Sequence, residues 1–349
     1  MAHTPVTQES STQLATAEQQ AALLRLMGGA RVTQMLHIAA KLGIADLLAE
    51  GLRNCDELAR LTDTHAPSLY RALRVLATVG IFAEVGERAF ELTPLAQLLR
   101  SDAPGSARNY VIMQGEPWMW QAWGDAMHSV RTGEPAFEHV HGIDFFGYLA
   151  REPEAAVVFN AAMTGRAGMA DVTVARAYDF SDAGVVCDVG GGHGVLLTTI
   201  LEAHPGVRGI LFDQPAVIDG ARARIDAAGL AGRCDLVAGD FFEAVPAGAD
   251  VYVMSNVIHD WDDERALVIL RSCHQAMAPG GRLLIVETLI PPGNEPHFGK
   301  MVDVQMLVLT GGGERTEAEY RALLAAAGFR PTRVIPTPST VSIIEGIRD

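Results

Sequence analysis

One histidine follows an apolar run of the kind that forms a buried strand. The run DVYVMSNVI stops directly before His259, at the strand end where a parallel sheet opens onto its ligand. An imidazole titrates near neutral pH, so it can take a proton from a substrate. Glu287 closes the next apolar run, and Glu314 lies in the segment GGGERTEAEY. Either carboxylate could orient the ring, so the sequence predicts His259 as a general base with Glu287 and Glu314 as its partners.

Four acidic residues follow this histidine, and they admit two interpretations. Histidine and carboxylates are metal ligands, so one interpretation is a metal site. The other is helix capping, because acidic side chains accept hydrogen bonds from the free N–H groups of a helix N-terminus. A helical pattern begins at Arg265, directly after these acids. We therefore favour capping and expect no metal; the four residues are Asp260, Asp262, Asp263 and Glu264.

A glycine-rich loop, GGGHG at 190–194, begins where the apolar run VVCDV ends. Gly190 and Gly192 let the chain turn tightly and bring backbone N–H groups against a ligand. The spacing is G-x-G-x-G, because Val195 stands where a dinucleotide fingerprint has its third glycine. S-adenosylmethionine carries a sulfonium cation and no pyrophosphate, and it suits an acidic crevice. The loop therefore favours S-adenosylmethionine over a nicotinamide cofactor.

Acidic residues at two later strand ends support a crevice that binds a nucleoside. Asp213 closes the run RGILFD about twenty residues after the loop, where a carboxylate can hold ribose hydroxyls. Asp240 follows the next run, and Phe241 comes directly after it, so the pair could hydrogen-bond and stack with an adenine. Since the carboxyl ends of parallel strands share one edge, we expect Gly190, Asp213 and Asp240 to line one crevice.

These residues together suit methyl transfer to an oxygen. An in-line displacement at a sulfonium needs alignment of the hydroxyl, the methyl group and the sulfur, and the removal of one proton. A phenol has a pKa near 10, so a histidine base in a dry pocket is a suitable acceptor for its proton. The reaction requires no nucleophilic side chain.

The elements that must position these residues fall after residue 176. Short apolar runs alternate there with helical patterns, and the runs are apolar enough to be buried on both faces. This alternation predicts a doubly wound α/β domain over 176–349, with a mostly parallel sheet between helices.

Residues 21–107 predict a small, mainly helical domain. Apolar residues recur at helical spacing over 21–50, and Gly28-Gly29 interrupts them, which implies two helices. A short helix, a turn, a helix ending at Gly80 and a hairpin with Gly86 at its tip follow, which is the outline of a winged helix.

A winged helix invites comparison with DNA-binding proteins. Arg71 and Arg74 lie on its second helix, which could enter a major groove. The segment is otherwise acidic, and the chain carries 42 Asp and Glu against 27 Lys and Arg, a net charge of −15. The sequence lacks the cluster of basic residues expected of a DNA-binding protein. Its negative charge also disfavours binding to anionic membranes, so we expect neither DNA nor a membrane as a partner.

Residues 108–175 are helical in pattern and rich in aromatic side chains. Two interpretations stay open: a packed helical core, or an apolar wall around a flat ligand. The segment contains Trp118, Trp120, Trp123, Phe137, Phe145, Phe146, Tyr148 and Phe159.

The N-terminal segment, the absence of targeting patterns in the sequence and the cysteines bear on order and cellular compartment. Residues 1–20 lack periodic apolar spacing, so we expect a disordered tail. This start has no signal-peptide pattern, and no apolar run is long enough for a membrane span, so we expect a cytoplasmic protein. The four cysteines form no CxxC pair and are interpreted as buried small apolar residues.

The motifs DVGGGHG, LFDQP, GDFF, HDWDDE and GGGERTEAEY, in this order, closely resemble the plant caffeate and hydroxyindole type of S-adenosylmethionine-dependent O-methyltransferase, including its bacterial natural-product members. The resemblance covers nearly the whole chain. It implies a Rossmann-like methyltransferase domain preceded by a winged-helix dimerisation domain, and therefore a homodimer. It also implies a small aromatic substrate with a hydroxyl group, from secondary metabolism.

The resemblance assigns roles to individual residues. His259 would be the base, bracketed by Glu287 and Glu314. The residues that would contact the methyl donor are Gly190, Gly192, Asp213, Asp240, Phe241 and Ser255. The wall of the substrate pocket would include Trp118, Trp123, Phe159, Met163, Asn256 and Met306.

Other classes of protein remain as alternatives. A ligand-sensing transcription regulator could be built on the winged helix, and it would bind DNA with a steep salt dependence. A nicotinamide oxidoreductase could be built on the glycine loop, and a family member could bind the methyl donor for chemistry other than methylation. Retention of His259 with both glutamates favours methyl transfer.

Overall fold

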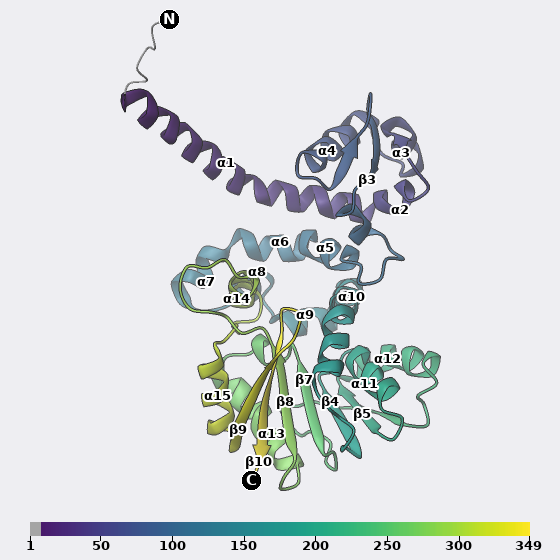
Figure 1. Cartoon of the computed structure of the whole chain (residues 1–349), viewed down its shortest axis with the longest axis vertical. Coiled ribbons are helices and arrows are strands. Elements are labelled where there is room, and N and C mark those ends of the chain that lie inside the picture. The colour runs from purple at the N-terminus through teal and green to yellow at the C-terminus, as the bar shows by residue number, and fades with distance from the viewer. Residues whose placement is uncertain (1–7) are drawn as a thin grey trace, which may run out of the picture. The chain divides into compact units, whose positions relative to one another are not determined.

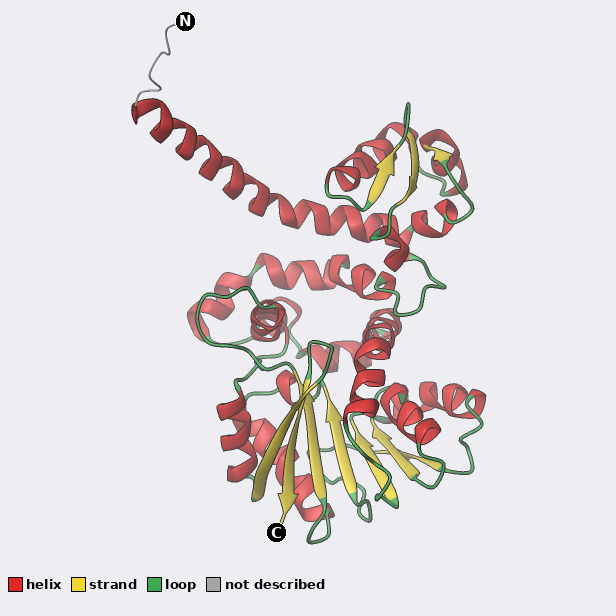
Figure 2. Ribbon diagram, viewed as in Figure 1, coloured by secondary structure: helices red, strands yellow, loops and turns green. Residues whose placement is uncertain are grey.

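The computed structural model describes residues 8–349, except for the side chains of residues 8–15 and 167–170. The chain divides into two compact units, Met1–Glu116 and Pro117–Asp349. Figure 1 follows the chain through both units, and Figure 2 shows the same view by secondary structure.

The first unit begins with one long helix, α1 (Gln8–Lys41), and this corrects two expectations. Residues 8–20 are helical where we expected a disordered tail, because Gln, Glu, Ala and Leu dominate them and all favour helix. Residues 1–7 lie outside the described part. The helix also continues through Gly28-Gly29, since two glycines cost a long helix only about 1 kcal/mol each. The break comes instead at Gly43, which has a φ of 66°.

The rest of the first unit has the winged-helix outline. Its three-stranded sheet has the order β1-β3-β2, and β2 and β3 form the expected hairpin. Its core contains Leu58, Leu73, Leu76, Phe82 and Phe90. The elements are α2 (Ile44–Leu48), β1 (Arg53–Asn54), α3 (Cys55–Leu61), α4 (Ala66–Thr78), β2 (Phe82–Glu84), β3 (Ala89–Leu92), a short 3₁₀ turn (Ala96–Leu99) and α5 (Arg108–Gly115).

Helix α5 belongs to this first unit, whereas the sequence predicts that residues 108–175 form one segment. The helix packs along α1, and the imidazole of His37 lies 2.8 Å from the carbonyl oxygen of Ile112. The ammonium of Lys41 lies 2.6 Å from a carboxylate oxygen of Glu116. These contacts place the division of the chain after Glu116.

The second unit contains a seven-stranded sheet of order β6-β5-β4-β7-β8-β10-β9. The first five of these strands are parallel, as expected, and β10 runs antiparallel to both of its neighbours. The order reverses between β4 and β7, and a ligand binds at such a switch point in open α/β sheets. The strands are β4 (Val185–Val189), β5 (Arg208–Asp213), β6 (Cys234–Ala238), β7 (Val251–Ser255), β8 (Arg282–Glu287), β9 (Phe329–Pro336) and β10 (Ser342–Arg348).

Helices cover both faces of this sheet, as Figure 2 shows. One face packs against α10, α11 and α12, and the other packs against α13 and α15, which gives two separate apolar cores. The central strands are apolar on both faces for that reason. The helices are α10 (Pro153–Ala177), α11 (Val195–Ala203), α12 (Pro215–Ala227), α13 (Asp263–Ala276) and α15 (Glu317–Ala326).

The aromatic segment of the second unit forms short helices before the sheet. Its rings pack closely: Trp118 contacts Phe137, Phe145 and Tyr148 at centroid distances of 6.4, 6.1 and 6.1 Å. Helix α14 packs against α8 and α6. The helices are α6 (Pro117–Gly124), α7 (Ala126–Thr132), α8 (Ala136–His141), α9 (Phe145–Arg151) and α14 (Phe298–Leu309).

Two further expectations concern the whole chain. Every helix within residues 8–349 is too short or too polar to cross a bilayer. The four cysteines are buried and free, which confirms their interpretation as small apolar residues; they are Cys55, Cys187, Cys234 and Cys273.

Candidate active site

His259 lies just beyond the end of β7, in a short 3₁₀ turn (Ile258–Asp260). Its ring is buried, with 4 % of the residue exposed. Nδ1 lies 3.0 Å from Oε1 of Glu314 and 3.3 Å from Oε2 of Glu287. The structure therefore brings together all three residues that the sequence singled out, and both carboxylates face the same ring nitrogen.

Glu287 ends β8 and is fully buried. Its Oε1 accepts hydrogen bonds from the backbone N–H groups of Val257, Ile258 and His259, at 3.0, 2.9 and 3.3 Å. One oxygen thus holds the turn that carries the histidine, while the other faces the ring. The two glutamates consequently differ: Glu287 holds the backbone of the turn by hydrogen bonds and lies within ion-pair distance of the ring, whereas Glu314 is hydrogen-bonded to the ring.

Burial and the neighbouring carboxylates have opposite effects on the pKa of His259. Burial lowers the pKa of His259, but the combined effect of Glu287, Asp260 and Glu314 is larger and raises this pKa to about 9. Burial also raises the pKa of Asp260 to about 6, and it raises the pKa of Glu287. The carboxylates around His259 thus stabilise an imidazolium.

The acids after His259 serve different purposes. Asp262 caps α13, since its Oδ1 accepts from the N–H of Arg265 at 2.8 Å, which confirms the capping interpretation for this residue. Asp263 and Glu264 lie in the first turn of the same helix. Asp260 was expected to be a capping residue, and this is wrong: its carboxylate lies 3.7 Å from Nε2 of His259 and its side chain is largely buried. Asp260 belongs to the 3₁₀ turn before α13, and this turn directs its side chain inward.

Among the side chains that the structure describes, two groups have ligand atoms close enough together to hold a metal ion. One is His259 with Glu287 and Glu314, and the other is Asp125 with His128 and His139. In the first group both glutamates face Nδ1, which would have to lose its hydrogen before it could coordinate a metal together with them. Our expectation of no metal stays a prediction.

The glycine loop follows β4 and turns as the sequence predicts. Gly190 and Gly192 have φ values of 69° and 57°, in the left-handed region that favours glycine. A Cβ atom on Gly190 would lie 2.8 Å from Cγ2 of Val257 and 3.7 Å from the ring of Phe241. A Cβ on Gly192 would meet no atom within 4 Å, so open space lies over the loop there. These residues fit a nucleoside-type cofactor lying along the loop.

The other predicted cofactor residues lie at the same edge of the sheet. Asp213 ends β5, and its carboxylate accepts from the N–H groups of Gly192 and Gln214 at 2.8 and 2.7 Å. Asp240 follows β6 and accepts from the N–H of Phe242 at 2.8 Å. Ser255 ends β7, and its hydroxyl accepts from the side-chain amide of Asn256 at 3.2 Å. The predicted cofactor residues therefore lie at the ends of four neighbouring strands, β6, β5, β4 and β7.

The predicted wall residues have different environments. Trp118 is buried in the aromatic core, which matches the packing interpretation of that segment. Phe159 contacts Phe145 at a centroid distance of 5.4 Å, and Met306 is buried on α14. Trp123 and Met163 are half-buried.

Asn256 has a backbone conformation that non-glycine residues rarely adopt. Its φ is 53°, in the left-handed region, and the residue sits between the end of β7 and the turn of His259. Asparagine tolerates this region better than most residues, and such conformations cluster at functional sites. This residue thus lies in the link between β7 and the 3₁₀ turn that carries His259.

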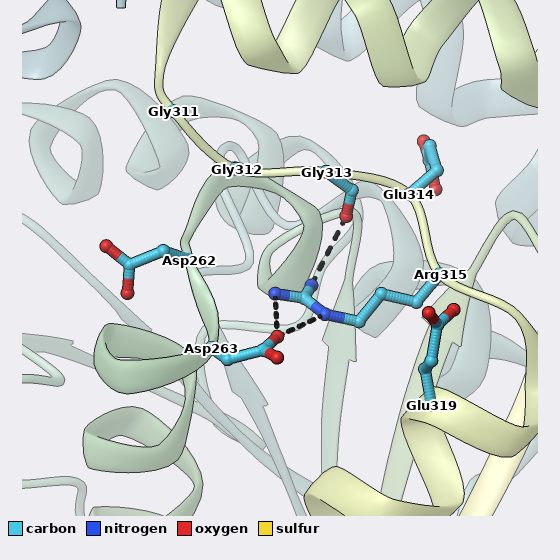
Figure 3. A pocket seen from close by; sticks show the side chains of 8 residues that line it. All are labelled: Asp262, Asp263, Gly311, Gly312, Gly313, Glu314, Arg315 and Glu319. Atoms are coloured by element: carbon cyan, nitrogen blue, oxygen red, sulfur yellow. Dashed lines mark hydrogen bonds and ion pairs between the residues drawn. The ribbon is translucent and has the colours of Figure 1, made fainter. Parts of the chain in front are cut away.

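The sequence reasoning missed Arg315, which lines a pocket of about 230 Å³ with Glu314 (Figure 3). The sequence signal that could have indicated Arg315 is a single arginine among acidic residues in the segment GGGERTEAEY. It also missed Asp303, whose Oδ1 accepts from the N–H of Glu314 at 3.0 Å. The pocket is lined by Asp262, Asp263, Gly311, Gly312, Gly313, Glu314, Arg315 and Glu319.

Two family models match this chain. Residues 24–102 match the O-methyltransferase dimerisation domain, and residues 120–330 match the O-methyltransferase domain. The chain belongs to the O-methyltransferase family. It is an S-adenosylmethionine-dependent enzyme with the methyltransferase fold, and the resemblance drawn from its motifs is confirmed.

Relatives of this O-methyltransferase are found in bacterial natural-product pathways. It is 50 % identical to a phenazine O-methyltransferase of Lysobacter antibioticus over 93 % of this chain and 94 % of the relative. It is 42 % identical to a mitomycin biosynthesis 6-O-methyltransferase of Streptomyces lavendulae over 89 % of each.

Solved structures agree with this assignment. The crystal structure of LaPhzM has a TM-score of 0.91 and 49 % identity, covering 95 % of this chain and 99 % of its own. A methyltransferase of calicheamicin biosynthesis, solved with bound S-adenosylhomocysteine, has a TM-score of 0.83 and 36 % identity over 95 % and 99 % of the chains.

Proposed function

We propose that this O-methyltransferase methylates a hydroxyl group of a small aromatic metabolite, with His259 as the general base. The contact between Nδ1 of His259 and Glu314 carries this proposal. A carboxylate can only accept a hydrogen bond, so Nδ1 carries the hydrogen and Nε2 is the basic nitrogen. Nε2 lies 3.7 Å from Asp260, too far for a hydrogen bond, so it can accept a proton from a substrate.

The proton then has a defined course. As the hydroxyl oxygen attacks the methyl group in line with the sulfur, its proton moves to Nε2 of His259. The resulting imidazolium is stabilised by Glu287 and Glu314, which face Nδ1, and by Asp260 beside Nε2. The bound cofactor supplies the methyl group and a sulfur leaving group, and the protein needs no covalent intermediate.

The methyl donor would lie along the glycine loop and the neighbouring strand ends. Asp213 would hold the ribose hydroxyls, and Asp240 with Phe241 would hold the adenine. Phe241 lies against the loop at Gly190, which supports a stacking position there. The residues proposed to contact the cofactor are Gly190, Gly192, Asp213, Asp240, Phe241 and Ser255.

The substrate would be a flat aromatic molecule. The rings of the second unit form a connected series from Trp118 through Phe145 and Phe146 to Trp261, which contacts Phe241 at a centroid distance of 6.0 Å. This series links the aromatic segment to the proposed cofactor residues. The residues proposed to form the pocket wall are Trp118, Trp123, Phe159, Met163, Asn256 and Met306.

Names of relatives support an aromatic acceptor. Two of them act on 3-amino-4-hydroxybenzoate and on 2,7-dihydroxy-5-methyl-1-naphthoate. A phenazine-1-carboxylate N-methyltransferase is also related, at 32 % identity. We favour a hydroxyl acceptor because its proton must be removed during methyl transfer, and a buried histidine held by carboxylates can accept that proton.

The dimerisation domain supports a homodimer as the working form, and the cytoplasm stays our predicted compartment.

The test is transfer of a labelled methyl group to matched acceptors. The protein is incubated with methyl-labelled S-adenosylmethionine and either a hydroxylated phenazine or naphthoate, or the analogue in which an amino group replaces the hydroxyl. We expect label in the hydroxylated compounds alone. Label only in the amino compounds would overturn the proposed acceptor.

A further inference from the structure

Arg315 joins the two loops that meet at His259. Its guanidinium donates to the carbonyl oxygens of Ile258 and Gly313, each at 3.2 Å, and to that of Trp261 at 2.8 Å. Its Nε donates to Oδ1 of Asp263 at 2.9 Å. Figure 3 shows the side chain extending from the loop of Glu314 to the start of α13. The side chain is 8 % exposed, so these bonds form in a largely dry environment.

The acceptors flank both partners of the base contact. Ile258 precedes His259, Trp261 follows it by two positions, and Gly313 precedes Glu314. One planar guanidinium therefore binds the backbone on each side of the contact between Nδ1 and the carboxylate. A displacement of either loop would change that 3.0 Å distance and the direction of Nε2.

Few other bonds in the described residues join these loops. The N–H of Gly313 donates to the carbonyl oxygen of His259 at 2.9 Å. The bonds from Arg315 to Ile258 and Trp261 add two more between the same segments. With the contact between His259 and Glu314, four hydrogen bonds in the described residues join residues 258–261 to residues 313–315, and Arg315 supplies two of them.

The ion pair with Asp263 is the weaker part of this arrangement. The side chain of Asp263 is 75 % exposed, so water screens its attraction for the guanidinium. The three carbonyl contacts need several donors in a fixed plane, which arginine has and lysine lacks. The geometry of the fork, rather than its charge alone, therefore holds the loops.

We propose that Arg315 is a positioning residue for catalysis: it sets the distance between His259 and Glu314, and thereby aims Nε2 at the substrate hydroxyl. This inference rests on the proposed role of His259 as the base. Arg315 itself need not touch either the cofactor or the substrate. A residue that only stabilised the fold would lower the melting temperature and leave turnover of the folded enzyme unchanged.

The test compares Arg315→Met and Arg315→Lys with Arg321→Met, which removes an arginine paired with Glu317 on the outer part of α15. We expect Arg315→Met to lower kcat by about 100-fold, the size of effect that a misplacement of about 1 Å produces. The affinity for S-adenosylhomocysteine should not change, because the hydrogen bonds of Arg315 go to Ile258, Trp261, Gly313 and Asp263, none of which is a proposed cofactor residue. The rising limb of the pH–rate profile should move to lower pH, since a looser Glu314 raises the pKa of His259 less.

The comparison of these variants tests the proposal. Arg315→Lys should stay closer to Arg315→Met than to wild type in kcat, and Arg321→Met should match wild type. If Arg315→Met fails to fold, Arg315→Lys carries the test, and wild-type kcat with an unmoved pH limb in the folded variant overturns the proposal. Wild-type turnover in His259→Ala would instead overturn the base assignment, so the two failures are distinguishable.

Discussion

The Nδ1 atom of His259 lies 3.0 Å from a carboxylate oxygen of Glu314, although 55 positions separate the two residues in the chain. The contact joins the turn after β7 to the loop before α15. It selects the tautomer of the ring, because the carboxylate accepts the hydrogen of Nδ1. The basic nitrogen of the ring is therefore chosen by a residue from a different element, and several measurable properties depend on that choice.

Replacing His259 should remove most of the turnover. His259→Ala deletes the proton acceptor, so we expect kcat to fall by about 10²–10⁴-fold, the usual contribution of a positioned general base. The affinity for S-adenosylhomocysteine, measured by calorimetry, should stay near that of wild type because the histidine acts on the substrate. A variant that keeps wild-type kcat would contradict the assignment.

The rate should rise with pH. The base must be neutral to accept a proton, and the pKa of His259 is raised to about 9, so the neutral fraction grows as pH approaches 9. We expect kcat/KM to climb and level off above about pH 9. Glu314→Gln removes one of the carboxylates that raise this pKa, so its limb should lie at lower pH.

An acidic phenol provides the control for this profile. A substrate phenol with a pKa near 10 would itself give a rising limb, whereas a nitro-substituted phenol ionises at much lower pH. The limb should persist with the nitro compound if it belongs to His259. A limb that follows the substrate and ignores Glu314→Gln would mean that the enzyme binds the phenolate directly.

Adding a methyl group at Gly312 should disturb the base. A Cβ atom there would lie 2.1 Å from the carbonyl oxygen of His259 and 2.5 Å from the backbone nitrogen of Trp261, so the backbone must move. We expect Gly312→Ala to lower kcat by about tenfold or more and to cost about 1–3 kcal/mol of unfolding free energy. Gly206→Ala, whose Cβ would meet no atom within 4 Å, is the matched control and should match wild type in a thermal-melt and kinetic comparison.

Replacing Asp213 should weaken cofactor binding. Asp213→Asn keeps the shape but loses the charge that holds the N–H of Gly192, and with it the proposed grip on the ribose. We expect the affinity for S-adenosylhomocysteine to fall by about 1–3 kcal/mol in a calorimetric titration. Asp226→Asn, an exposed acid on α12, should bind as wild type does. Equal affinity in both variants would mean that the ribose lies elsewhere.

The residues that the sequence could identify are those fixed by local rules. The glycine loop, Asp213, Asp240 and His259 each follow an apolar strand, and the carboxyl ends of parallel strands meet at one edge, so their proximity follows from the strand pattern. That both Glu287 and Glu314 reach the same nitrogen depends on loop paths, which no local pattern encodes. Arg315 was missed for a related reason: a charged residue before a helix is typical of a solvated surface.

Helix α1 shows that local sequence rules can also miss regular structure. Residues 8–20 have helix-favouring types but no periodic apolar face, so a search for periodicity passes over them. The glycine pair at 28–29 weakens a helix without ending it when both flanks are strongly helical. Gly43 ends the regular stretch because its left-handed backbone is incompatible with continuing it.

The position of β10 between β8 and β9 has a consequence for how this domain is assembled during translation. The ribosome produces β9 before β10, yet β9 joins the sheet only through β10. Until β10 emerges, β9 has no partner strand and the outer edge of β8, the strand that carries Glu287, stays open to wrong pairing. Insertion of β10 between β8 and β9 therefore completes the sheet. We infer that slow synthesis of residues 288–341 prolongs the period when the nascent chain is most prone to aggregate.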